Sequence, residues 1–307
     1  MSNVAAMALS GATETAWDLN AHVQTLTEVR CAQLRQVLAQ GGAGLYLLMD
    51  PLLGDPVLPE VPPESMSLEA LNALRAQAWQ RNTHALCLPS KLSMDGAFAP
   101  YLVELQSAHD VWIETSVQWA VQETVHSWTA EPDQPTPHRV GGWLQSPAQG
   151  GALAAAMTGW LKLNAATAGQ ASYLRLADRR VLSLAVHVLG EACVAQALRP
   201  LEQWLWLDPQ AALLSVSAAA PLADAEADIS GDHTASQPLT RFSHAQWAQM
   251  ALGPQVHRAM AQAIGQAAAL GQPQGLARWQ PVSATQWQTA LAQAERQHKE
   301  VKEGMHP

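Results

Sequence analysis

The stretch SYLRLADRRVL, residues 172–182, joins an alternating apolar segment to three consecutive charged residues and then to a second apolar segment. The first part is typical of a β-strand, and the apolar pattern over residues 179–198 is typical of a helix. Asp178 stands at the junction, where its carboxylate can accept a hydrogen bond from the backbone N–H of residue 180 or 181. We therefore predict a strand that leads through an aspartate cap into a helix.

The two arginines after Asp178 need a negative partner. Arg179 and Arg180 would lie at the positive end of the helix dipole, which disfavours cations. Asp178 is one candidate partner, and a guanidinium group can also bridge neighbouring loop carbonyls. Arg175, Asp178 and Arg180 could instead form a catalytic group, but we favour a structural role for them.

Strand and helix patterns alternate through the first ~215 residues, which predicts an α/β fold with a mixed, largely parallel sheet flanked by helices. Caps are expected at Ser67 and Asp110, and Ser146-Pro147 suits a further helix start. The expected strands are 45–50, 84–88, 101–105, 140–145, 172–176, 204–207 and 212–216.

The composition changes after the last expected strand. Residues 218–240 contain acidic residues but no Lys or Arg, and little bulk, which is typical of a solvated linker or long loop. The remaining segment has helical patterns that begin near Ser243, Pro254 and Ser283. We therefore expect an α/β lobe over 1–217, an acidic Ala/Ser/Pro linker or long loop over 218–240, and a small all-helical lobe over 241–307.

Charge and cysteine content narrow the class of protein. The net charge of −9 argues against broad binding to nucleic-acid phosphates, although it permits one local basic patch. Three unpaired cysteines suit a reducing compartment. The first residues make a poor signal peptide, and no apolar run is long enough for a membrane span. We expect a cytoplasmic protein that binds neither nucleic acid nor membrane.

Familiar catalytic and metal-binding motifs are missing from the sequence. It contains no G-x-S-x-G and no H-E-x-x-H, and its histidines are dispersed without a short-range ligand pair. Asp50, at the end of an expected strand, is the best single catalytic candidate, but a loop-capping aspartate explains it more simply. We therefore expect no catalytic, metal or cofactor site.

Four segments, taken in order, resemble the effector chaperone or adaptor domain family of type VI secretion systems. YLRLADRRVL (173–182) is similar to the family pattern fRfyDPRvL, and LYLLMDPLL (45–53) is similar to its opening strand. APYLVEL (99–105) and GGWLQSP (141–147) resemble two further family segments. The resemblance covers roughly residues 44–207. Arg179 stands where the family usually has proline, and Ala177 where it has an aromatic residue.

The resemblance implies a bacterial protein that is not an enzyme. Such an adaptor binds a cognate toxic effector and helps to load it on the VgrG spike or an associated tip protein. The family positions carried over to this sequence are Asp50, Pro100, Tyr101, Arg175, Asp178 and Arg180.

Tryptophan is over-represented, with 12 Trp against 3 Tyr and 2 Phe. Most are expected in the core, but Trp is also enriched at binding hot spots. Trp247, Trp279 and Trp287 are our candidates for contacts with a partner. Two alternatives stay open: an enzyme with Asp50 and a histidine as an acid/base pair, and a structural component of a secretion baseplate.

Overall fold

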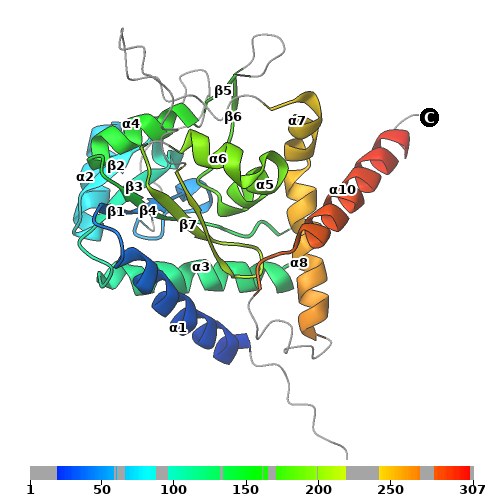
Figure 1. The fold of residues 1–307 in the computed structure, drawn as a ribbon, viewed down its shortest axis with the longest axis horizontal. Helices are drawn as coiled ribbons and strands as arrows, with labels where there is room; N and C mark the ends of the chain where they lie inside the picture. Colours follow the sequence, from blue (N-terminus) through cyan, green and yellow to red (C-terminus); the bar gives the residue numbers. More distant parts are fainter. Residues whose placement is uncertain are drawn as a thin grey trace, which may run out of the picture.

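Six strands form the central sheet of the computed structural model, in the order β2-β3-β1-β4-β7-β8 (Figure 1). The structure describes residues 19–58, 60, 66–87, 96–131, 134–160, 162–164, 171–198, 200–218, 242–269 and 280–304. The sheet strands are β1 (Gly44–Met49), β2 (Thr83–Ala85), β3 (Tyr101–Leu105), β4 (Val140–Ser146), β7 (Gln203–Leu207) and β8 (Leu213–Ser217). Two short strands, β5 (Lys162–Asn164) and β6 (Ala171–Tyr173), pair separately.

Every neighbouring pair in the six-stranded sheet is antiparallel, so the predicted largely parallel sheet is wrong. The cause is the strand order. These pairings make β1 run parallel to β2, and β3 run parallel to β4, as expected for strands joined through a helix. However, β3 lies between β1 and β2, and β1 lies between β3 and β4. Each helix-linked pair is therefore split by a strand of opposite direction.

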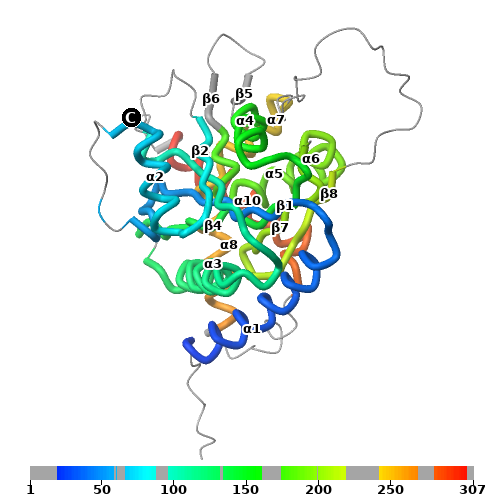
Figure 2. Tube along the Cα trace, turned by 90° about the vertical axis from the view of Figure 1, so that its left-hand side faces the viewer, coloured from blue at the N-terminus to red at the C-terminus, as the bar shows by residue number. Residues whose placement is uncertain are grey.

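Helices cover both faces of the sheet. Figures 1 and 2 show α1 beside α3 on one side, and Figure 1 shows α4, α5 and α6 on the other. The helices are α1 (Leu19–Leu38), α2 (Leu68–Trp79), α3 (Val111–Thr129), α4 (Gly150–Trp160), α5 (Arg179–Leu189), α6 (Glu191–Ala197), α7 (His244–Ala251), α8 (Gly253–Ala269) and α10 (Ala284–Gly304). Short 3₁₀ turns, η1 (Pro51–Leu53) and η2 (Gly96–Phe98), follow β1 and precede β3.

The predicted helix starts are confirmed at three capping residues. Ser67 accepts from the Ala70 N–H, and Asp110 from the Trp112 N–H. Ser243 forms a reciprocal capping box with Gln246. The start at Ser146-Pro147 is wrong, because Ser146 completes β4 and α4 begins at Gly150.

The helix predicted over residues 179–198 is broken into two. Gly190 has φ +85°, a conformation that glycine adopts without strain, and α5 and α6 meet there at a bend of 116°. Among the described residues no single helix is long and apolar enough to cross a membrane, and the α5–α6 pair reaches that length and composition only when both parts are combined.

Tryptophans fill the core on both faces of the sheet. Trp143 faces α3 and donates to the Ser116 hydroxyl at 2.9 Å. Trp204 and Trp206, two residues apart in β7, share the opposite face, where Trp206 donates to the Ser183 hydroxyl of α5 at 2.9 Å. All three are at most 1 % exposed. The indole N–H groups thus gain the partners that buried Trp requires.

The C-terminal helices pack against the sheet layer along one side (Figure 1). Gly265 of α8 lies so close to the Trp128 carbonyl oxygen at the end of α3 that an added Cβ would clash with it. The Val282 N–H donates to Asp208, in the β7–β8 connection, at 2.7 Å. The predicted linker falls almost wholly on residues 219–241, which lie outside the described residues.

Candidate functional site

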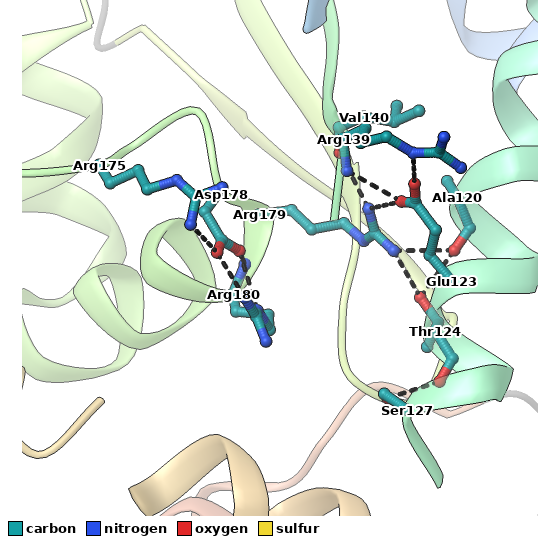
Figure 3. Close-up of polar contacts among 10 residues, drawn as sticks. All are labelled: Ala120, Glu123, Thr124, Ser127, Arg139, Val140, Arg175, Asp178, Arg179 and Arg180. Carbon is teal, nitrogen blue, oxygen red and sulfur yellow. Dashed lines mark hydrogen bonds and ion pairs between the residues drawn. The ribbon is translucent and has the colours of Figure 1, made fainter. Parts of the chain in front are cut away.

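Asp178 caps α5 as predicted. Its Oδ1 accepts from the backbone N–H of Arg180 at 3.0 Å, and the Arg180 guanidinium binds both carboxylate oxygens, at 3.0 and 2.7 Å (Figure 3). Arg175 approaches the same carboxylate at 3.5 Å. We call Arg175, Asp178 and Arg180, with Asp50, the Asp178 cluster. These contacts confirm the prediction that the Asp178 carboxylate balances the charge of Arg180.

Arg175 joins the Asp178 cluster to the end of β1. Its Nε lies 2.6 Å from Oδ2 of Asp50, and Oδ1 of Asp50 accepts from the Leu52 N–H and caps η1. Asp50 is 1 % exposed. The partners of Asp50 are therefore an arginine and a backbone N–H, rather than the histidine that an acid/base pair would need.

The two carboxylates of the cluster respond differently to burial. Burial raises the pKa of Asp50, and the charge of Arg175 offsets this only in part. Burial also acts to raise the pKa of Asp178, but the adjacent Arg180 guanidinium, with contributions from His138 and Arg175, holds that pKa far below its usual range. Asp178 is consequently ionised, and both of its carboxylate oxygens are bound by arginine side chains.

Arg179 points away from the Asp178 cluster, towards α3 (Figure 3). Its Nη1 donates to Glu123 and to the Val140 carbonyl, both at 3.0 Å. Its Nη2 donates to the Ala120 carbonyl at 2.9 Å and to the Thr124 hydroxyl at 3.0 Å. Sequence reasoning missed this role; the available signal was Glu123, an acidic residue within the apolar pattern of α3.

Pro100 and Tyr101 belong to a separate group. The Tyr101 hydroxyl donates to Asp55 at 3.0 Å, and the Arg75 guanidinium lies 4.0 Å from the centre of the Tyr101 ring. Arg75 and Asp55 are themselves paired at 2.9 Å. The Pro100 carbonyl accepts from the Leu86 N–H. Burial, as the largest effect, raises the pKa of Tyr101. This group links β3 to α2 and to the loop that follows β1.

A cavity of about 520 Å³ lies beside the Asp178 cluster. Its walls come from the end of α3 and the segment leading to β4, from the start of α5, and from α7 and α8. The apolar part of the lining includes Leu174, Val181, Leu184, Trp247 and Met250, and the polar part includes His138, Arg175, Asp178, Arg180, His257 and Arg258. The volume falls within the roughly 300–1,000 Å³ typical of ligand pockets.

Two histidines of the cavity lining have no hydrogen-bond partner. His138 is 3 % exposed, and both ring nitrogens of His138 and of His257 are buried without a partner among the described residues. Burial, followed by the charges of nearby arginines, lowers the pKa of His138 well below its usual value. Burial, followed by the charge of Arg180, lowers the pKa of His257 to about 3. Both rings are therefore neutral at neutral pH.

The three tryptophans predicted to contact a partner have different surroundings. Trp247 lines the cavity and is half-buried, with its ring 6.0 Å from that of Phe242. Trp287 is 6 % exposed and lies between the rings of His187, at 5.5 Å, and His257, at 6.1 Å. Trp279 lies outside the described residues. Of the two that are described, only Trp247 is available to a ligand.

The described part of the chain holds no group of three His, Cys, Asp or Glu side chains able to bind a metal ion. Comparisons with known protein families, with curated proteins and with solved structures found no match. The cavity and the Asp178 cluster are thus the features from which a function can be argued.

Proposed function

We propose that this chain is an effector-specific chaperone or adaptor of a bacterial type VI secretion system. In this proposal it acts in the cytoplasm, without catalysis, binds a cognate toxic effector, and helps to load it on the VgrG spike or a tip protein. The observation that carries the proposal is that Arg175, Asp178 and Arg180 line one cavity, with Asp50 bound to Arg175 behind its wall. These are positions by which the sequence resembles that family.

The character of the cavity supports a binding role. Its apolar wall combines side chains from α5 with Trp247 and Met250 of α7, so that a ligand would contact both the sheet layer and the C-terminal helices. An extended or helical segment of a partner can bury apolar side chains in a groove of this kind. Such burial would shield a segment that is otherwise prone to aggregate.

The test is co-expression with the products of neighbouring genes. We expect one of them to become more soluble and to co-elute with this chain in size-exclusion chromatography. Trp247→Ala should weaken that complex, whereas Trp119→Ala, in a tryptophan group on α3 that does not line the cavity, should not. Thermal melts check that both variants are folded.

Two outcomes would contradict the proposal. The first is that no neighbouring gene product co-purifies. The second is association with the secretion machine in the absence of any effector, which a baseplate component would show. A spike gene upstream and a toxin gene downstream would support the proposal independently.

A further inference from the structure

The cavity lining contains arginines with unused hydrogen-bond donors, whereas the carboxylates of the Asp178 cluster are paired. Both carboxylate oxygens of Asp178 are bound by Arg180, and the Asp50 carboxylate is paired with Arg175. Arg180 uses Nε and Nη2 for that pair, which leaves Nη1 without an acceptor among the described residues. The carboxylates of the cluster therefore have no remaining capacity for a cationic ligand.

Arg258, on α8, supplies the strongest unused donor. Arg258 is an exposed residue that lines the cavity, and it forms no ion pair or hydrogen bond with any residue in the described part of the chain. Glu131 is the one carboxylate of the lining outside the cluster, and it is exposed. The neutral rings of His138 and His257 each add one N–H without an acceptor and one ring nitrogen without a donor. A bound ligand rich in acceptors would complete these groups.

We propose that the cavity binds an apolar peptide segment of the partner protein that carries an acidic side chain, with Arg258 binding the carboxylate and Trp247 and Met250 contacting the apolar part. This inference rests on the proposed function for the identity of the partner. The charge complementarity itself is a property of the cavity and can be measured without any partner. A guanidinium–carboxylate pair provides both the charge and the geometry for such recognition.

The first experiment uses two dyes of nearly equal apolar size. Anilinonaphthalene sulfonate carries an anionic group, and N-phenylnaphthylamine is its uncharged counterpart; both fluoresce when they enter an apolar site. We expect Arg258→Glu to weaken sulfonate binding by about tenfold while it changes binding of the uncharged dye little. Arg296→Glu, at an exposed position on α10 outside the cavity lining, is the matched control and should change neither.

Location is checked by filling the cavity. Ala261 lines it from α8, so Ala261→Trp places an indole inside and should displace both dyes. Equal sulfonate affinity for wild type and Arg258→Glu would overturn the inference, as would unchanged binding of both dyes to Ala261→Trp. Circular dichroism of each variant confirms that it is folded.

The second experiment identifies the segment in a co-purified complex. A photo-crosslinking amino acid at position 250 should capture a partner peptide that contains an apolar run and an Asp or Glu, and Arg258→Glu should reduce the yield. A complex that forms normally but gives no such crosslink overturns this inference and leaves the proposed function intact. If the dyes bind as expected but no partner co-purifies, the charge complementarity of the cavity is supported and the proposed function is contradicted.

Discussion

Arg179 and Glu123, 56 residues apart in the chain, form a buried ion pair with 3.0 Å between Nη1 and Oε2. Arg180, the next residue, faces the opposite way and binds Asp178. The first turn of α5 is thus fixed on two sides, to α3 by one arginine and to its own cap by the other. This arrangement makes the stretch from Arg175 to Arg180 a junction between layers of the fold.

Removal of the Asp178 carboxylate should be strongly destabilising. Asp178→Ala loses the helix cap and leaves Arg180 without its buried carboxylate partner, while Arg175 keeps Asp50, so we expect a loss of about 2–4 kcal/mol in the free energy of unfolding. Asp178→Asn keeps an acceptor for the Arg180 N–H and should lose less. Urea unfolding of the three proteins gives the comparison; equal midpoints would contradict the structural role.

Arg179→Pro should destabilise the protein, although proline is favourable at the first position of a helix. The substitution removes Arg179 from the buried Glu123, which keeps Arg139 at 2.7 Å, and it also removes the donors to the Val140 and Ala120 carbonyls, so we expect a loss of about 2–3 kcal/mol. A double-mutant cycle with Glu123→Gln measures the coupling. Additive effects of the two substitutions, or a gain in stability with proline, would show that the pair contributes nothing.

Two glycines in helices should respond oppositely to alanine. Glycine to alanine inside a helix normally stabilises by up to about 1 kcal/mol, and at Gly151, exposed in α4, an added Cβ would make only an ordinary contact, 3.9 Å from His84 Nδ1. At Gly265 the same Cβ would clash with the Trp128 carbonyl and push α8 away from α3. We expect Gly151→Ala to raise the melting temperature and Gly265→Ala to lower it. Equal shifts for both would contradict the close packing of α8.

Stability should fall on mild acidification because of His257. The folded protein keeps this ring neutral down to about pH 3, whereas in the unfolded chain it takes up a proton near pH 6.5. The unfolded state therefore binds more protons within this window. The stabilising contribution is complete above about pH 6.5 and falls by about 1.4 kcal/mol for each pH unit below it. His138, whose pKa is also lowered, acts with the same sign.

The measurement is the free energy of unfolding of wild type and His257→Gln between about pH 7 and pH 5. The variant should lose less stability over that interval than wild type. His298→Gln, at an exposed position on α10, is the matched control and should follow wild type. Parallel curves for wild type and His257→Gln would contradict a buried, neutral imidazole.

Local features of the fold were predictable because they depend on neighbouring residues. Ser67, Asp110, Asp178 and Ser243 each cap a helix as their position in the sequence predicts. Strand direction was not predictable in the same way. A helix between two strands predicts that they run parallel, which these pairs do, but it contains no information about a third strand inserted between them.

In the candidate site too, the sequence identifies individual residues, whereas their contacts depend on the tertiary structure. The sequence marks Asp50 and Arg175 separately, and only the tertiary structure places them 2.6 Å apart. His138 and His257 carry no local pattern, since each gains its role from burial against an element distant in the chain. Trp287 could not be told from Trp247 by sequence, because both lie in helical segments and differ only in what packs over them.

The inserted order of the strands also bears on when the protein can fold. Among the described strands β1, at residues 44–49, comes first in the chain, yet its two neighbours in the sheet are β3 and β4, which end at residues 105 and 146. Until the ribosome has released β4, one edge of this mostly apolar strand has no permanent partner. A protein proposed to shield another chain from aggregation thus has, during its own synthesis, a central strand that must wait for nearly half of the sequence.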